Sequence, residues 1–369
     1  MSSSAQTTLR WTLSAPPTAP PARSHFAMTY DGVRALSILY GGADSTHTPL
    51  GDIWEWNGTT WTQVAPSGVT PAPRQLHAMA FDPARNNTVV FGGRTAPGNN
   101  GETWTWNGTA WNQAQVSGPS PRSDAAMTYD LARGEIVLFG GLIAGDVPSD
   151  ETWVWNGLIW TQRTVNGPSP RSGHAMTFDA GRAVIVLFGG TTAGGPSNET
   201  WEWNGSAWSQ RTIADPPAPR SDHTMAFDST RYVVLLYGGH AGASQMYVNE
   251  TWDGNGTQWT LQTLPGPQNQ DYQLVYDDAR RRAVLFGGPA PATGETWLLK
   301  TVCLADLVGL GTPGPDGQLT ADDLIFFLSA FFSSSSLADL ASLGGDPTPD
   351  GQFTADDLVT FLAAFFGGC

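Results

Sequence analysis

The feature that most constrains the fold is a unit of about 49 residues that occurs six times along the chain. Each copy has a short apolar run that ends in a pair of glycines, and the first glycine of each pair is Gly41, Gly92, Gly140, Gly189, Gly238 or Gly287. The spacings are 51, 48, 49, 49 and 49 residues. Such self-similarity indicates one supersecondary unit per repeat. With 43 Gly and 27 Pro in 369 residues, long helices are disfavoured over most of the chain.

Each repeat shows the same four motifs in the same order. In the third repeat an Asp-x-x-Arg turn (Asp130, Arg133) is followed by the apolar run 136–139 and then by Trp153-Val154-Trp155-Asn156-Gly157 and a further Trp. The β-branched and aromatic runs predict strands. Asn-Gly predicts a two-residue hairpin, because both central positions of such a turn need positive φ. Each repeat is therefore predicted to form four short antiparallel strands, a to d.

The two ends of the repeat region are complementary. The sixth repeat supplies strands a, b and c, with Trp297 in strand c, but no Trp follows for a strand d. Near the N-terminus, Trp11-Thr12 matches Trp61-Thr62 of the first repeat. We therefore expect a mainly β fold, a six-bladed β-propeller in which the N-terminal strand completes the last blade and leaves no open sheet edge.

A Gly-Gly pair after an apolar strand, with Trp about a dozen residues later, resembles the kelch repeat, and the resemblance covers residues 1–300. It implies a propeller that binds a protein or a glycan. The alternative is a carbohydrate-active enzyme on the same fold, either a kelch-type sugar epimerase or a sialidase-like enzyme, although the sialidase Ser-x-Asp-x-Gly-x-Thr-Trp boxes are absent. Fold alone does not decide between these functions.

The connections between strands indicate the binding face. In a four-stranded meander the b–c and d–a connections lie on one side, and here they are long and variable, as expected of binding loops. Five d–a connections end in an arginine: Arg23, Arg74, Arg122, Arg171 and Arg220. A ring of guanidinium groups suits a carboxylate or sulfate ligand. Alternatively, they pair with the acidic residues that precede strand c: Asp52, Glu102, Glu151, Glu199, Glu250 and Glu295.

Departures from the repeat point to further ligand contacts. In the sixth repeat Pro-Arg-Ser is replaced by a segment that contains Asp271 and Tyr272, and the loop 240–248 carries His240 and Tyr247. We expect these four residues to contact the ligand. A three-histidine metal site is conceivable at one shared repeat position, but packing is the favoured interpretation because the histidines lie on separate blades: His77, His174 and His223.

The composition changes after Lys300. Residues 301–369 contain no Trp, Lys or Arg and hold two copies of a 34-residue unit, each a loop followed by an amphipathic helix. The second loop fits the EF-hand pattern of calcium ligands, with Gly351 at position 6: Asp346, Thr348, Asp350, Gln352, Thr354 and Asp357. The first loop keeps only Asp316 and Asp323, so calcium binding there stays open. The alternative is that these aspartates cap helices and shape turns.

Twin calcium-loop and helix units resemble a type I dockerin of the variety that ends in Gly-Cys, over residues 303–369. The resemblance implies a small all-α calcium-binding domain (301–369) that anchors the propeller (1–300) to a cohesin-like partner. It also implies a disulfide between Cys303 and Cys369, and hence an oxidising compartment, extracellular or at the cell surface. The alternative is two free thiols in a cytosolic chain.

Charge and hydropathy exclude other classes of protein. The formal net charge of −15 disfavours a nucleic-acid partner, which needs a basic patch. No stretch approaches the roughly 18 apolar residues of a membrane span. The first ten residues lack the apolar core of a secretory signal, so the chain either stays inside the cell or has such a signal removed or missing here.

Overall fold

The structure is a computed structural model, and it describes residues 7–242, 246–264, 266–268, 271–288 and 294–303. The chain divides into two compact units, Trp11–Leu298 and a second that joins Met1–Arg10 to Leu299–Cys369. The dockerin-like segment from residue 304 onward lies outside the described residues. All of its predicted calcium ligands and Cys369 lie there too, so the calcium site and the disulfide stay predictions.

Six four-stranded sheets form the blades of the described fold, one sheet to each blade. The first three blades are β2 (Ala27–Asp31), β3 (Leu36–Tyr40), β4 (Ile53–Trp56) and β5 (Trp61–Val64); β6 (Ala78–Asp82), β7 (Asn87–Phe91), β10 (Thr103–Trp106) and β11 (Trp111–Ala114); β12 (Ala126–Asp130), β13 (Glu135–Phe139), β16 (Thr152–Trp155) and β17 (Trp160–Arg163). The last three are β18 (Ala175–Asp179), β19 (Val184–Phe188), β22 (Thr200–Trp203) and β23 (Trp208–Arg211); β25 (Thr224–Asp228), β26 (Val233–Tyr237), β29 (Thr251–Gly254) and β30 (Trp259–Gln262); β31 (Gln273–Asp277), β32 (Arg282–Gly287), β33 (Glu295–Cys303) and β1 (Thr7–Ser14).

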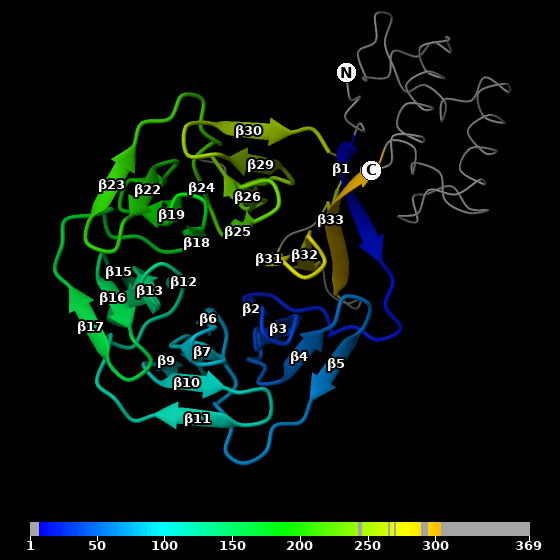
Figure 1. Ribbon diagram of the computed structural model, residues 1–369. Coiled ribbons are helices and arrows are strands. Elements are labelled where there is room, and N and C mark those ends of the chain that lie inside the picture. Colours follow the sequence, from blue (N-terminus) through cyan, green and yellow to red (C-terminus); the bar gives the residue numbers. More distant parts are fainter. Residues whose placement is uncertain (1–6, 243–245, 265, 269–270, 289–293, 304–369) are drawn as a thin grey trace, which may run out of the picture. The chain divides into compact units, whose positions relative to one another are not determined.

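The blades form a closed ring. Each innermost strand packs beside the innermost strand of the next blade, and β31 of the sixth blade packs beside β2 of the first. Figure 1 shows these strands around a common centre. The sixth sheet has the order β1-β33-β32-β31, so the N-terminal strand supplies its outer edge. The predicted six-bladed propeller and its closure by the segment around Trp11 are confirmed.

The Asp-x-x-Arg motif makes the a–b turn in every blade. In the first blade Asp31 Oδ1 accepts hydrogen bonds from the backbone N–H groups of Val33 (3.0 Å) and Arg34 (2.9 Å), while Arg34 Nε donates to Asp31 Oδ2 at 2.6 Å. The same Asp–Arg ion pair occurs in the other five turns. The carboxylate thus satisfies turn donors that no strand partner reaches, as the sequence predicts.

The prediction of a two-residue Asn-Gly hairpin between strands c and d was wrong. Trp56 pairs directly with Trp61, so the loop has four residues, and of its residues only Gly58 has positive φ (100°). Asn57 Oδ1 accepts hydrogen bonds from the backbone N–H groups of Thr59 and Thr60, both at 2.9 Å. This Asx turn, made by the asparagine side chain, replaces the expected backbone turn.

The paired glycines end strand b because a side chain would not fit there. Gly189 has φ of 66°, and a Cβ at this position would lie 2.6 Å from the Arg220 carbonyl oxygen and 2.9 Å from the His223 ring. Both contacts belong to the next blade along the chain. The glycines therefore let the connection that enters each blade pass directly over the end of the preceding one.

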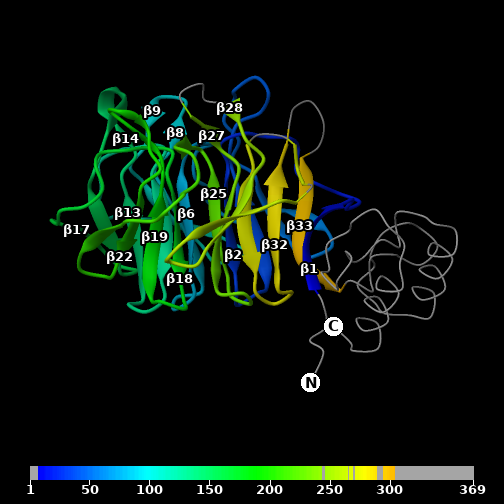
Figure 2. The same cartoon turned by 90° about the horizontal axis from the view of Figure 1, so that it is seen from above.

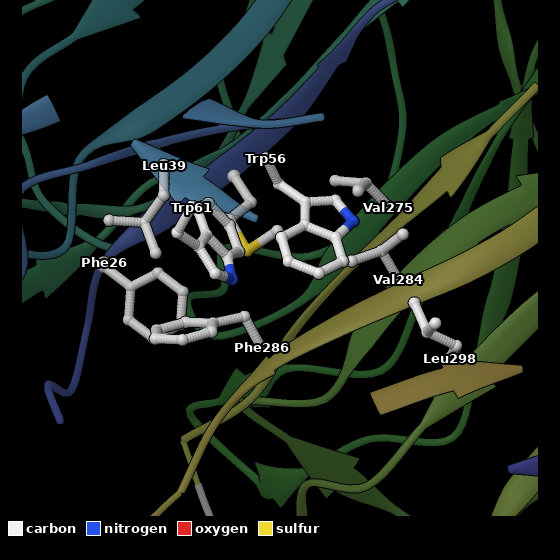
Figure 3. Packing of buried hydrophobic residues seen from close by; sticks show 9 residues of the cluster. Phe26, Leu39, Trp56, Trp61, Val275, Val284, Phe286 and Leu298 are labelled. Atoms are coloured by element: carbon white, nitrogen blue, oxygen red, sulfur yellow. The ribbon is translucent and has the colours of Figure 1, made fainter. Parts of the chain in front are cut away.

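Tryptophans of the outer strands hold adjacent blades together. Phe26, Trp61 and Phe286 lie together between the first and sixth blades (Figure 3), and the ring centroids of Trp61 and Phe286 are 5.1 Å apart. The Trp61 indole also donates to Thr296 Oγ1 of the sixth blade at 2.9 Å. Equivalent Trp-to-Thr bonds cross four other blade interfaces, from Trp11, Trp160, Trp208 and Trp259.

One interface lacks this bond. The indole Nε1 of Trp111 is buried without a partner, because the facing position of the first blade is Ile53 instead of Thr. We expect Trp208→Phe to lower the free energy of unfolding by about 1 kcal/mol more than Trp111→Phe, since only Trp208 loses a hydrogen bond and leaves Thr152 unpaired. Urea titrations of the two variants check this, and equal losses would contradict it.

Candidate functional site

The b–c and d–a connections lie on one face of the propeller and surround the mouth of its channel. Four b–c connections form short hairpins: β8 (Arg94–Thr95) with β9 (Gly98–Asn99), β14 (Leu142–Ile143) with β15 (Val147–Pro148) on either side of η1 (Ala144–Asp146), β20 (Thr191–Thr192) with β21 (Gly195–Pro196), and β27 (His240–Ala241) with β28 (Met246–Tyr247). Figure 2 shows β8, β9, β14, β27 and β28 along the same edge of the sheets. In the fifth blade β27 also pairs with β24 (Arg220–Ser221), which belongs to the d–a connection.

A ring of six residues surrounds the cavity at this mouth, one from each blade. We call it the mouth ring: His25, Leu76, Asp124, Gly173, Asp222 and Asp271. All six have left-handed backbone conformations, with φ between 54° and 63°. Backbone hydrogen bonds connect neighbours around the ring, such as Leu76 N–H to the His25 carbonyl at 2.8 Å. The cavity has a volume of about 190 Å³.

The five predicted arginines are buried beside this mouth and fully engaged. Arg171 donates to Glu199 Oε2 at 2.5 Å, to the Gly189 carbonyl at 2.9 Å and to the Ser169 carbonyl at 3.0 Å. The other four make the same set of bonds within their own blades, with Asp52, Glu102, Glu151 and Glu250. Every one of these arginine side chains is 0% exposed. The arginines therefore connect the d–a loops to strands b and c, and present no free guanidinium to a ligand.

Tyr272 is likewise part of the framework. It is 5% exposed, and its hydroxyl donates to Glu295 Oε2 at 3.0 Å. The same oxygen accepts a hydrogen bond from the Trp297 indole at 2.9 Å. In the other blades the carboxylate that pairs with the repeat arginine accepts from a tryptophan in the same way, as Glu250 does from Trp252. In the sixth blade the tyrosine hydroxyl thus takes a role that an arginine has elsewhere.

His240, Tyr247 and Asp222 form a contiguous group at the rim. His240 Nδ1 lies 3.1 Å from Asp222 Oδ2, and the rings of His240 and Tyr247 have centroids 3.9 Å apart. The hydrogen bond with Asp222 raises the pKa of His240. Burial acts to raise the pKa of Asp222, but the hydrogen bonds with His240 and Ser221 outweigh burial and lower this pKa. The structure therefore brings two of the predicted ligand contacts, His240 and Tyr247, together on the fifth blade.

Comparison with known proteins decides the family. The family described as "KLHDC2/KLHL20/DRC7 Kelch-repeats domain" matches residues 4–156 and 128–303, which is most of the chain. The chain belongs to the kelch-repeat family. A solved structure titled "Structure of YjhT" is similar to this kelch-repeat chain with a TM-score of 0.60 and 13% identity, over 78% of this chain and 99% of that one. At that identity the likeness shows the fold alone. No curated protein sequence matches the chain.

Asp124 and Asp271 are the remaining acids of the mouth ring of this kelch-repeat protein. Burial, and the nearby charge of Asp222, raise the pKa of Asp124 to about 7. Burial also raises the pKa of Asp271, against the opposing effects of His25 and His240. Because the five arginines are paired with their carboxylates, the ionisable groups that face this mouth are three carboxyl groups and His25, with His240 beside Asp222 and Arg94 close enough to affect the pKa of Asp124. Of the two alternatives that the sequence left open, the arginines therefore follow the one in which they pair with the acidic residues that precede strand c.

The raised pKa of Asp124 has a consequence for stability. The folded protein holds this proton more tightly than the unfolded chain, so the stabilisation is complete below pH 4 and is lost as the pH rises toward 7. We expect Asp124→Asn, which stays neutral, to raise the free energy of unfolding by about 1–2 kcal/mol at pH 8 and to leave it nearly unchanged at pH 4. Urea titrations at both pH values measure this, and an equal effect at both would contradict it.

The three histidines of the shared repeat position line the inner part of the same cavity. Burial, together with the neighbouring arginine, lowers the pKa of His77, His174 and His223 to about 3, so the rings are neutral. Each ring packs against the aromatic residue that ends strand b of the preceding blade, such as Phe139 against His174 at 5.5 Å. Within the described residues, no group of three or more His, Cys, Asp or Glu side chains is placed to hold a metal ion.

The opposite end of the channel combines apolar side chains with polar ones, among them Thr29, Ser229 and Asp278. Five blades place a methionine at the same position of the innermost strand, and the sixth places Leu274 there: Met28, Met79, Met127, Met176 and Met225. Aromatic side chains follow two residues later, from Tyr30 and Phe81 to Tyr276. Among the described residues, no helix has the length and hydropathy to cross a membrane.

Sequence reasoning missed three residues of the mouth ring that carry charge or polarity: His25, Asp124 and Asp222. A pattern that could have found them is present, because all three lie two residues after the repeat arginine. The other ring positions hold Leu76, Gly173 and Asp271, so the residue type varies around the ring. A position that is constant in backbone conformation and variable in side chain is where a symmetrical scaffold acquires specificity.

Proposed function

We propose that this kelch-repeat protein is a binding protein that takes its ligand, a protein or a glycan, at the mouth of the propeller channel on the face of the b–c and d–a loops. The observation that supports this most strongly is the mouth ring itself. It gathers Asp124, Asp222 and Asp271 around a cavity whose rim carries His240 and Tyr247. Convergent polar groups around a concave site on a rigid scaffold favour ligand binding there.

Binding is favoured over the alternative of a carbohydrate-active enzyme. A sialidase-like or sugar-epimerase site on this face would use free arginines to hold a sugar carboxylate. The five arginines beside the mouth are 0% exposed and each is paired with a carboxylate. The enzymatic alternative depended on free arginines at the mouth, but these five form ion pairs within their blades.

We further propose that the segment 301–369 anchors the propeller outside the cell. The support is the sequence alone: the dockerin-like repeats, the calcium-ligand pattern from Asp346 to Asp357, and the cysteines at 303 and 369. Calcium would order this segment for docking to a cohesin-like protein, and a disulfide between the cysteines would suit an extracellular or cell-surface location.

The ligand-binding proposal is tested with the full chain on a peptide array and a glycan array. We expect a set of ligands whose binding falls at least tenfold in His240→Ala/Tyr247→Ala, while a double variant on the outer hairpins, Thr59→Ala/Thr109→Ala, binds as the parent does. Ligands that bind both variants equally, or none at all, would overturn the proposal.

The anchoring proposal is tested by calorimetric titration of the full chain with calcium. We expect at least one site that is lost in Asp350→Ala/Asp357→Ala and is kept in Asp316→Ala/Asp323→Ala. Absence of calcium binding to the full chain would overturn the calcium-dependent anchor.

A further inference from the structure

We propose that the ligand group inserted at this mouth is an organic cation, the ammonium or guanidinium of a lysine or arginine side chain in an extended segment of a partner protein. This inference rests on the proposed function and names the chemistry of its ligand. Of the two roles that the sequence left open for the repeat arginines, an anion site or pairing within the blades, it follows from the second.

The first argument is the balance of charge at the mouth. Asp124, Asp222 and Asp271 converge on the cavity from the third, fifth and sixth blades. In the third and fifth blades the arginine of the d–a connection pairs with a carboxylate of its own blade, and in the sixth blade Tyr272 takes that role. His240 lies against Asp222.

The cations near these three carboxyl groups are His25 in the ring itself, His240 beside Asp222, and Arg94, which pairs with Asp146. Carboxyl groups thus outnumber the unpaired cations around this concave site, which favours a positively charged ligand group.

The second argument is independent of the acidic residues. His77, His174 and His223 line the same cavity at 5–6% exposure, and their ring nitrogens make no hydrogen bond of normal geometry. Each ring interacts with one backbone carbonyl at the end of the preceding strand b, that of Tyr40, Phe139 or Phe188, which accounts for the nitrogen that carries the proton. A neutral imidazole keeps one nitrogen as an acceptor. Buried acceptors without donors favour a ligand that brings several N–H groups, as ammonium and guanidinium do.

The size and walls of the cavity select a side chain over a larger ligand. Its volume of about 190 Å³ is below the roughly 300–1,000 Å³ of sites that enclose whole small molecules. Leu76 and Ala125 supply an apolar part of the wall, which suits the methylene groups that precede a lysine or arginine head group. A bare metal ion is disfavoured because the described His, Asp and Glu side chains form no group of three placed to ligate one.

The test is a binding titration of the full chain with three ten-residue peptides that alternate Gly with Lys, Gln or Glu. We expect the lysine peptide to bind at low ionic strength and to lose at least about tenfold in affinity in Asp222→Asn/Asp271→Asn. The matched control is Asp150→Asn/Asp215→Asn, which changes the net charge equally at two exposed aspartates outside the cavity and should retain the parent affinity. Thermal melting of both variants verifies that they are folded.

The outcomes separate this inference from the proposed function. Equal loss in the two double variants would show nonspecific attraction to an acidic protein and would overturn the inference. Preference for the glutamate peptide, or for neutral oligosaccharides, would also overturn it while leaving ligand binding at the mouth intact. Loss of lysine-peptide binding on addition of stoichiometric calcium or zinc would indicate a metal at the aspartates and would overturn it as well.

Discussion

Arg171→Ala is expected to lower the free energy of unfolding by about 3–5 kcal/mol, the largest effect of any substitution near the mouth. The guanidinium is 0% exposed, and its loss removes a donor from the Gly189 and Ser169 carbonyls. It also leaves the Glu199 carboxylate without its cation, with only the Trp201 indole and the Gln210 amide as donors. The bonds of Arg171 join a d–a loop to strands b and c of the fourth blade. We therefore expect the variant to weaken the packing of the whole fourth blade and not only one contact at the surface. Urea titration followed by tryptophan fluorescence measures the loss.

The matched control for this prediction is Arg163→Ala. Arg163 is 41% exposed on strand d of the third blade, and its nearest bond to Glu135 is 3.4 Å long. Exposed pairs of this kind contribute less than about 1 kcal/mol. If Arg171→Ala costs no more than Arg163→Ala, the buried pair does not hold the blade, and the arginines regain a role in ligand binding.

Trp11→Ala is expected to cost about 3–5 kcal/mol and to accelerate unfolding. Trp11 is 4% exposed, packs at 5.5 Å against Tyr237 and donates to Thr251 Oγ1 at 3.0 Å. It lies in β1, the strand that the N-terminus adds to the sixth sheet. The ring of blades is therefore closed by noncovalent contacts at this strand, and weakening them provides a route for the blades to separate.

Trp160→Ala is the comparison for the closing strand. Trp160 has the same position in a blade made of one continuous segment, is 6% exposed and donates to Thr103 Oγ1 at 2.8 Å. We expect a similar loss of equilibrium stability but slower unfolding than for Trp11→Ala in stopped-flow measurements with guanidinium chloride. A loss below about 1 kcal/mol for Trp11→Ala would show that β1 does not close the ring.

The repeat architecture could be predicted from the sequence because several separate features of the repeat indicate the same fold. The Gly-Gly spacing, the Asp-x-x-Arg turns and the missing last Trp all indicated six sheets closed by the segment around Trp11. The Asn-Gly hairpin was mispredicted because the pair was treated as a backbone turn. The carboxamide of Asn57 instead accepts two backbone donors and stabilises a longer loop.

The electrostatic sign of the mouth could not be predicted from the pattern alone. The sequence shows both the arginines and the acidic residues, but not whether they pair. Pairing requires that the d–a loop cross the end of strand b, so that an arginine such as Arg171 can bond to the Gly189 carbonyl and to Glu199. Asp124 and Asp222 share a repeat position, two residues after the arginine, but the residue type at this position differs between blades, because a left-handed backbone position tolerates several residue types. Only the geometry of the ring brings them together.

The central claim is that the five repeat arginines are internal to the blades and that the mouth is acidic as a result. Its most direct test is chemical modification of the native full chain with phenylglyoxal, which reacts with accessible guanidinium groups, followed by peptide mass spectrometry. We expect the arginines at 23, 74, 122, 171 and 220 to stay unmodified until the protein is denatured, while Arg163 and Arg211, at 41% and 44% exposure, react in the native state. Modification of the five at the rate of Arg163 would contradict the claim and restore an anion-binding mouth.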